Sequence, residues 1–352
     1  MRSSVDKVLP LIWICLVFAV LIVARRKNKP QEFGFTPDPE ATARFLAELD
    51  KPLFADAGSE VVRKAKGVDT FLWRYADRCH RQVYGKPYGP WKQGIGDCVS
   101  FGWALGCYVA SCCDYVSGDT PKPPLVVATE PIYGGARCEQ RGVDFAGWSD
   151  GATGSGAARW VRGLKSGIGG VLFREDYGRG IDLTTYSSDR AKNWGCYGCG
   201  GKGNAWLDKE ANKHTAREVA LVKTYEEACS AIECGLPVVI CCNIGWSSVR
   251  GPDGFAARSG RWLHCQCAIG VRYKQNAGGR DGICIMNSWG SRWQSGGKWP
   301  SDQPDGCYWC DKETFQAVLA QGESFAVAGI NGFVWRELDH RAWIQNDEPN
   351  QD

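Results

Sequence analysis

The chain lacks a surplus of either charge. Its 42 lysines and arginines are nearly balanced by 39 aspartates and glutamates, which leaves a net charge of +3 over 352 residues. The positive side chains are spread along the sequence and form no basic stripe of the kind that tracks a phosphate backbone. The sequence has no internal repeat either, which argues against a repeat architecture. We therefore expect a globular protein with no nucleic-acid partner.

Histidine is also scarce, with four residues in the whole chain, so few side chains can act as a base near neutral pH. His80, His214 and His340 lie in charged or polar stretches, where a solvated surface position is the simplest interpretation. His264 differs, because it lies at the start of the strand-like run of small and apolar residues 263–271. It is the one candidate for a catalytic base.

Apolar side chains, by contrast, are plentiful. They make up 44% of the chain and aromatic side chains 12%, which is enough for a substantial core. Glycine, with 44 residues, and tryptophan, with 16, are both frequent. This composition suits a loop-rich fold with close backbone contacts better than a helical bundle.

Residues 8–24 carry no charge and reach the lower length limit for crossing a bilayer core of about 30 Å, so we expect a retained membrane anchor after a short tail at residues 1–7. A cleaved signal peptide is one alternative, but Ile22 and Ala24 make a poor cleavage site. A buried helix of the next domain is another, and the run has no polar face to fit one.

The side of the membrane follows from the flanking charges. Arg25, Arg26, Lys27 and Lys29 follow the anchor, and the positive-inside rule then places the rest of a single-pass protein on the cytoplasmic side. A reducing compartment would keep its cysteines free, whereas a disulfide-bonded exterior domain would reverse this topology. Residues 25–60 are expected to form a Pro-punctuated linker, in which Asp38 caps a short helix.

The most informative stretch is residues 92–104, where a Gly-broken loop leads to Cys98 at the start of an apolar helix. Free backbone N–H groups and the positive end of the helix dipole favour a thiolate there and would also meet an oxyanion. Gln93 can supply one more donor. Asp97 is the expected N-cap, and its charge would oppose the thiolate.

A base next to a thiol needs an orienting partner. Asn287, at the end of a second strand-like run, is the natural candidate, because a neutral amide can accept a hydrogen bond from one ring N–H of His264. Trp289 could cover that bond from water.

Gln93 and Cys98 with a helix after them, His264 before a small-apolar strand, and the string Asn-Ser-Trp-Gly at 287–290 resemble the papain-like cysteine peptidase family. The resemblance covers residues 61–335 and is greatest to divergent bacterial and phage-encoded members. It implies that Cys98 is the nucleophile, that His264 is the base and then the acid, that Asn287 orients the imidazole and that Gln93 belongs to the oxyanion hole.

The same resemblance implies an α+β fold of two lobes. A helical lobe would carry the nucleophile helix and a β-rich lobe the histidine and asparagine, with a cleft between them for a peptide or protein substrate and no cofactor or metal. Gly154, Ser155 and Gly156 resemble the glycine-rich stretch that lines the substrate cleft, and with Trp289 they are the expected substrate-binding residues.

This sequence departs from the family pattern around the nucleophile. The Gln-to-Cys spacing is one residue short, Val99 replaces the usual tryptophan, and the cysteine expected just upstream for a disulfide is missing. These departures concern the oxyanion hole and its bracing. The linker 25–60 is too short to resemble the family's inhibitory propeptide, so something else would have to restrain an active enzyme.

Periodicity predicts the main elements of the domain. The helix after Cys98 is apolar on all sides and is therefore expected to be central, with Gly102 and Gly106 admitting a neighbouring backbone. A half-buried helix is expected over 157–167, and Thr224 and Glu227 predict a capped helix that ends at Gly235. Strands are expected at 238–244, 264–273, 282–289 and 324–335, and a polar tail at 336–352.

Two C-x-x-C pairs, Cys196 with Cys199 and Cys307 with Cys310, have the spacing of zinc ligands, and together they could form a four-thiolate site. The alternative is that they are core thiols or separate disulfides, and we expect no metal. Three functions remain: a membrane-anchored cysteine endopeptidase, a papain-like shell kept for binding or as part of a particle, and a zinc-stabilised interaction protein. The presence of all four catalytic residue types favours the first.

Overall fold

The computed structural model describes residues 31–139, 150–163, 167–329 and 332–338. The predicted anchor at residues 8–24 lies outside the described residues, as does the polar tail from residue 339 onward. Among the helices that are described, none is long and apolar enough to cross a bilayer.

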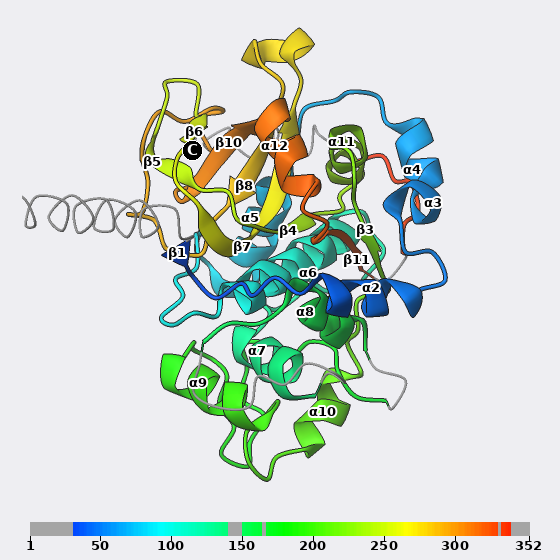
Figure 1. Ribbon diagram of the computed structural model, residues 1–352, viewed down its shortest axis with the longest axis vertical. Helices are drawn as coiled ribbons and strands as arrows, with labels where there is room; N and C mark the ends of the chain where they lie inside the picture. Colours follow the sequence, from blue (N-terminus) through cyan, green and yellow to red (C-terminus); the bar gives the residue numbers. More distant parts are fainter. Residues whose placement is uncertain (1–30, 140–149, 164–166, 330–331, 339–352) are drawn as a thin grey trace, which may run out of the picture.

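The chain folds into a sheet lobe and a helical lobe (Figure 1). The sheet lobe is built on an eight-stranded sheet, in which every pairing is antiparallel except that of β1 with β7. Its path is β10 (Cys307–Asp311), β8 (Gly282–Met286), β7 (Trp262–Arg272), β4 (Val238–Cys242), β11 (Ser324–Ala328) and β3 (Glu218–Leu221), while β1 (Gln31–Glu32) and β2 (Thr70–Phe71) both pair with β7.

A small sheet of β6 (Ala256–Arg258), β5 (Trp246–Arg250) and β9 (Ser295–Gly296) lies beside the large one. The helical lobe consists of α7 (Thr129–Cys138), α8 (Gly154–Arg162), α9 (Ser188–Tyr197) and α10 (Trp206–Ala211). The remaining elements are α2 (Pro39–Ala47), α3 (Phe54–Ala57), α4 (Ser59–Lys64), α5 (Leu72–Tyr84), α11 (Tyr225–Glu233), the π-helix η2 (Lys274–Gly278) and α12 (Lys312–Leu319). The predicted α+β class and two-lobe arrangement are confirmed.

Helix α6 (Cys98–Val116) lies between the lobes and is buried on nearly all sides, as its apolar sequence predicts (Figure 1). A Cβ atom on Gly102 would lie 2.7 Å from Sγ of Cys265, and one on Gly106 would lie 2.7 Å from a methyl group of Val239. Both glycines therefore let strands β7 and β4 approach the helix, which confirms the prediction of a close neighbour.

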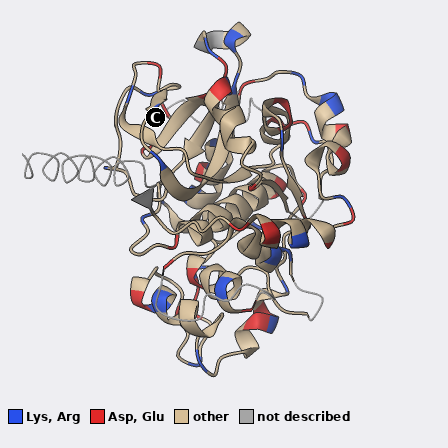
Figure 2. Cartoon of the chain, viewed as in Figure 1, with Lys and Arg blue, Asp and Glu red and all other residues tan. Residues whose placement is uncertain are grey.

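The other predicted elements are present with shifted ends. Helix α8 begins at Gly154, where the hydroxyl of Thr153 accepts from the N–H of Gly156 at 3.0 Å, and it ends at Arg162. The cap at Thr224 is confirmed by a 3.2 Å bond from the N–H of Glu227. Strands occur at all four predicted places. Figure 2 shows that the positions of Lys and Arg and those of Asp and Glu are interspersed along the chain in both lobes.

Residues 31–60, expected as a linker, pack along both lobes. β1 pairs in parallel with the start of β7, and α2 contacts α8 in the helical lobe. The predicted cap at Asp38 is present, because its carboxylate accepts from the N–H of Ala41 at 2.8 Å. The dark blue trace in Figure 1 runs from β1 to α2 across the boundary between the lobes. We refer to residues 31–37 as the cleft segment.

Candidate active site

Cys98 is the first residue of α6 and is completely buried. Its sulfur accepts a 3.3 Å hydrogen bond from the backbone N–H of Cys265 on β7. Because Cys265 directly follows His264, this bond brings the start of the helix against the strand that carries the candidate base. The two residues predicted to act together therefore come from the central helix and from the sheet lobe.

The imidazole of His264 is held by Asn287, which follows β8. The His264 Nε2 atom lies 2.8 Å from Oδ1 of Asn287, and the N–H of Ser288 donates to the same oxygen at 2.7 Å. An oxygen that accepts from Ser288 also accepts from the ring, so Nε2 carries the proton. Nδ1 is then the basic nitrogen, and it is buried without a hydrogen-bond partner among the described residues.

Trp289 covers the bond between His264 and Asn287. Its ring stacks on the imidazole with a centroid distance of 4.6 Å and an interplanar angle of 28°. Trp262 and Trp293 pack against Trp289 at 5.0 and 5.3 Å. This cluster excludes water from the polar pair, which is the position that the sequence predicts for Trp289.

Burial sets the protonation of the candidate pair. It lowers the pKa of His264 to about 4, with the hydrogen bond that the ring donates to Asn287 acting in the opposite direction. Burial also raises the pKa of the Cys98 thiol well above its usual value, although the N–H of Cys265 lowers it. In this covered arrangement the pair is a neutral thiol and a neutral imidazole, because both charged forms would be poorly solvated.

Gln93 lies at the predicted position, but its side chain is occupied. Its Nε2 group donates to the backbone oxygens of Phe33 at 3.1 Å and Ile95 at 2.9 Å. Its Oε1 atom accepts from the hydroxyl of Ser288 at 2.6 Å, which fixes the orientation of the amide. The carbonyl of Phe33 thus takes the position next to Gln93 that a substrate carbonyl would need.

The cleft segment is bonded to both lobes. On the sheet side, the N–H groups of Phe33 and Phe35 donate to the oxygen of Leu263 at 3.0 and 3.4 Å. On the helical side, the oxygen of Gly34 accepts from the N–H of Ala152 at 2.9 Å, and the N–H of Thr36 donates back to Ala152 at 3.0 Å. The segment therefore crosses the cleft directly in front of the candidate base.

Two contacts show how closely the segment fits. The ring of Phe33 lies 4.5 Å from that of Trp289 and 5.5 Å from that of His264. Gly34 has a φ of +118°, and a Cβ atom there would lie 2.1 Å from the oxygen of Gly96. Only glycine fits this position, because a side chain would meet both backbone strain and the loop before Cys98. A cavity of about 640 Å³ borders the segment between Gln93, Asp150 and Leu263.

The predicted substrate-binding glycines lie elsewhere. Gly154, Ser155 and Gly156 form the buried first turn of α8, and the N–H of Gly154 donates to Glu323 at 3.2 Å. At this wall the residues that contact the cleft segment are Gly151 and Ala152. A substrate-binding role for 154–156 stays a prediction.

The predicted cap at Asp97 is wrong. Its carboxylate makes no bond to an N–H of α6 and instead accepts from the hydroxyl of Tyr186 at 2.9 Å. The side chain points into the helical lobe because that hydroxyl lies there, and the first turn of α6 bonds to the backbone oxygen of Asp97. Tyr186 and Glu323 were both missed by sequence reasoning, since neither lies in a periodic stretch or a motif.

The two C-x-x-C pairs do not meet. Cys196 and Cys199 lie at the end of α9 in the helical lobe, and Cys307 and Cys310 lie on β10 in the sheet lobe (Figure 1). Within the described ranges no group of three or more His, Cys, Asp or Glu side chains could hold a metal ion, and every cysteine there is a free thiol. The four-thiolate alternative is therefore wrong.

Comparison with known proteins gives matches in structure but none in sequence. No family model matches the chain, and no curated protein matches it. Among solved structures, xylellain, a cysteine protease from Xylella fastidiosa, is similar with 15% identity and a TM-score of 0.49, over 86% of this chain and 98% of that one.

Two further structures are similar over most of their length. They are procathepsin B S9 from Trypanosoma congolense (12% identity, TM-score 0.46, 90% of this chain and 97% of that one) and procathepsin L 3 of the Tenebrio molitor larval midgut (12%, 0.43, 93% and 94%). These names agree with the resemblance predicted from the motifs. At such identities and TM-scores the likeness bears on neither the substrate nor the role of any residue.

Proposed function

We propose that the chain is a divergent papain-like cysteine peptidase with Cys98 as its nucleophile. The single observation that carries this proposal is a set of three hydrogen bonds, which join Cys98 to the residue after His264, His264 to Asn287, and Gln93 to the residue after Asn287. Each of the four has the chemical character that thiol acyl transfer requires: a sulfur at a helix start, a base with a free nitrogen, an orienting amide and an oxyanion donor.

The proposed reaction runs through two acyl transfers. His264 Nδ1 accepts the thiol proton while the sulfur attacks the peptide carbonyl, and the resulting oxyanion is met by Gln93 Nε2 and the N–H of Cys98. The C–N bond then breaks, and the amine leaves with the proton from His264. A water molecule next attacks the thioester and gives a proton to the imidazole. The C–S bond breaks, and the proton returns to the sulfur.

The cleft segment would restrain this chemistry. It places the Phe33 carbonyl on Gln93 and an aromatic ring against His264, and Cys98 itself is completely buried. We propose that hydrolysis requires the segment to leave the cleft, which removes its bonds to Leu263 and Ala152 and exposes the donors that it occupies. In this proposal residues 31–37 restrain the peptidase, although the linker 25–60 is too short to resemble an inhibitory propeptide.

The test is peptide hydrolysis by the full chain carrying Gly34→Ala, which cannot keep the observed path of the segment. Adding Cys98→Ala or His264→Ala is expected to abolish hydrolysis. Adding Asn287→Ala should leave residual activity, because the amide orients the ring and transfers no proton. Hydrolysis that persists at full rate in the Cys98→Ala chain would overturn the proposal. Gly89→Ala serves as the control, since a Cβ there meets nothing within 4 Å.

A membrane location is a separate proposal that depends on residues 8–24 alone. We propose a single-pass anchor with the peptidase domain on the cytoplasmic side, because the cations at 25–29 follow the apolar run. Extraction of membranes with alkaline carbonate tests the anchor. Release of the full chain into the supernatant would contradict it.

A catalytically silent shell is the second candidate function. The observation that favours it is the complete burial of Cys98. In such a shell Cys98 would not react with a thiol probe even where Gly34→Ala displaces the segment.

A further inference from the structure

The loop before the nucleophile is tied at both ends to a single hydroxyl group. The N–H of Gly94 donates to the hydroxyl of Tyr186 at 3.1 Å, and that hydroxyl donates to Oδ2 of Asp97 at 2.9 Å. The loop between these two residues separates Gln93 from Cys98. Tyr186 therefore sets the distance between the two groups that would meet a substrate carbonyl.

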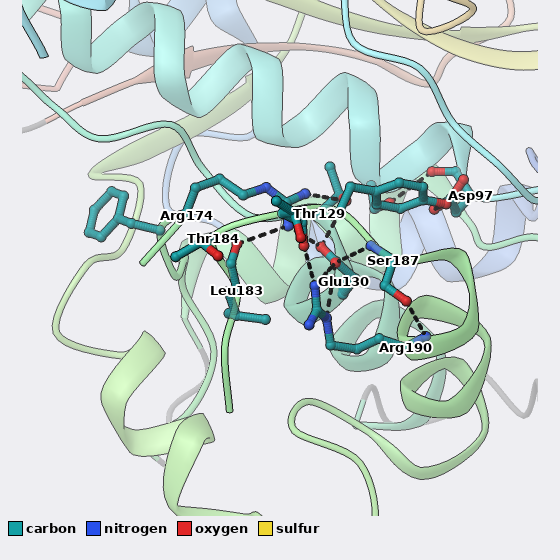
Figure 3. Close-up of polar contacts among 12 residues, drawn as sticks. Asp97, Thr129, Glu130, Arg174, Leu183, Thr184, Ser187 and Arg190 are labelled. Carbon is teal, nitrogen blue, oxygen red and sulfur yellow. Dashed lines mark hydrogen bonds and ion pairs between the residues drawn. The ribbon is translucent and has the colours of Figure 1, made fainter. Parts of the chain in front are cut away.

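Tyr186 is itself held firmly in the helical lobe. The N–H of the next residue, Ser187, donates to Oε1 of Glu130 at 3.0 Å, and Glu130 is completely buried. Arg174 and Arg190 form ion pairs with Glu130 at 2.7 and 2.9 Å, so three parts of the chain meet on one carboxylate (Figure 3). The ring of Tyr186 also packs edge-on against Phe101 of α6 at 5.1 Å.

Asp97 is completely buried, and its second oxygen, Oδ1, has no hydrogen-bond partner among the described residues. Burial raises the pKa of this carboxyl to about 8, the bond from Tyr186 lowers it, and the charges of Glu130 and Asp150 raise it further. The one cation near this tie is Arg174 among the contacts described, 6.0 Å from the Tyr186 ring centroid. Burial therefore shifts the carboxyl next to Cys98 toward its protonated form near neutral pH.

This protonation matters to the sulfur. An ionised Asp97 would raise the pKa of the Cys98 thiol through like-charge repulsion. A carboxyl that stays protonated near neutral pH can accept the tyrosine hydrogen bond without opposing the thiolate. The expected penalty of an acidic residue directly before the nucleophile would then appear only at alkaline pH.

We propose that Tyr186 is a positioning residue for the reaction, acting through Gly94 and Asp97 to hold Gln93 and the start of α6 in register. This inference rests on the proposed peptidase function. In this proposal Tyr186, a residue of the helical lobe, supports the loop before Cys98, which lacks the upstream cysteine expected for a disulfide. Asp97 is its partner, because its carboxylate accepts the hydrogen bond from the Tyr186 hydroxyl.

Tyr186→Phe removes the hydroxyl and leaves the ring in place. The matched control is Tyr177→Phe, because the hydroxyl of Tyr177 also accepts from a backbone N–H, that of Phe173, at 2.9 Å. In the full Gly34→Ala chain we expect Tyr186→Phe to lower kcat about tenfold at unchanged KM, as a shift of positioned groups does. Tyr177→Phe should leave both values unchanged. Equal kcat values for the two variants would overturn the proposal.

Asp97→Asn gives an independent readout, since its amide oxygen can still accept from Tyr186 but cannot ionise. Iodoacetamide labelling of Cys98, mapped by mass spectrometry from pH 6 to about 10, needs no peptidase activity. We expect the Asn variant to match the parent below pH 7 and to label faster above pH 8, on the order of tenfold. Tyr186→Phe should move the change in slope to higher pH, because it removes a bond that lowers the Asp97 pKa.

These experiments distinguish the peptidase proposal from the proposal that Tyr186 is a positioning residue. If no chain hydrolyses peptides but the labelling profiles shift as described, the peptidase proposal fails and the tie between Tyr186 and Asp97 stands. If peptides are hydrolysed and neither profile shifts, the tie is wrong. Should Tyr186→Phe not fold, the Asn variant still decides, because an alkaline profile identical to that of the parent contradicts a charge on Asp97 beside the sulfur.

Discussion

The two ring nitrogens of His264 differ in their hydrogen bonding and therefore in the roles that they can have. Nε2 donates to Asn287 beneath the ring of Trp289, and Nδ1 has no hydrogen-bond partner among the described residues. A fully buried imidazole resists protonation, because the charged form loses its solvation. The geometry thus provides a base, while its strength depends on how much water reaches it.

This burial predicts a stability change with pH. The pKa of His264 is about 4 in the folded chain and 6.5 when the ring is unperturbed. Between pH 4 and pH 6.5 the imidazole is therefore protonated in the unfolded chain and neutral in the folded chain. Stability should therefore fall as the pH drops from 6.5 toward 4, by about 2–3 kcal/mol for this group. Urea unfolding at pH 7 and pH 4.5 measures it.

The control is His264→Gln, which retains a hydrogen-bond donor for Asn287 and cannot titrate. We expect its loss of stability on acidification to be smaller than that of the parent chain. The same loss in both chains would show that His264 is not the group responsible.

At the scale of elements, α2 is fastened to the two lobes by one buried carboxylate. Glu323, just before β11, accepts from the hydroxyl of Thr42 at 2.6 Å and from the N–H of Gly154 at 3.2 Å. Burial raises the pKa of Glu323 to about 7, although the bond from Thr42 lowers it. Because the cleft segment leads directly into α2, this contact bears on whether the segment stays in place.

The docked arrangement favours protonated Glu323, since the docked pKa of about 7 exceeds the ordinary value of 4.5. Docking should therefore be strongest below pH 4.5, should weaken as the pH rises from 4.5 to about 7, and should level off above that. Hydrogen exchange of residues 33–47 is expected to speed up between pH 4.5 and about 7, beyond the intrinsic effect of hydroxide. In Glu323→Gln that additional rise should disappear, and its persistence there would contradict a latch at Glu323.

At the scale of the whole molecule, the sequence predicts which residues form the site better than it predicts that the site is covered. The order of Cys98, His264 and Asn287 and the apolar helix after Cys98 are local signals, and the structure brings these residues together. The path of the cleft segment depends on backbone pairing with Ala152 and Leu263, both more than 100 positions away, which no local pattern encodes. The predicted orientation of Asp97 is wrong for a similar reason. Its carboxylate could accept from an N–H group of α6 or from the hydroxyl of Tyr186, and the local sequence does not show that the hydroxyl is near.

The cysteines give a prediction for the molecule as a whole. Every cysteine in the described ranges is a free thiol, and of these only Cys138 is exposed. Titration with Ellman's reagent in denaturant without reductant should therefore find free thiols throughout, and titration of the folded chain should find few that react quickly. Several disulfides in the denatured chain would contradict this arrangement.

The central claim is that Cys98 is a nucleophile activated by His264 and covered by the cleft segment. The most direct measurement is labelling of the full chain with an epoxide thiol probe, followed by mapping of the modified cysteine. We predict slow labelling of the parent chain and of the control Gly89→Ala. In Gly34→Ala we predict faster labelling that is confined to Cys98. The same result is expected for Phe33→Ala, which removes the ring contacts of the segment with His264 and Trp289 and places no atom against Gly96. Adding His264→Ala should abolish the gain. Labelling at other cysteines, or none at Cys98 in either opened chain, would contradict the claim.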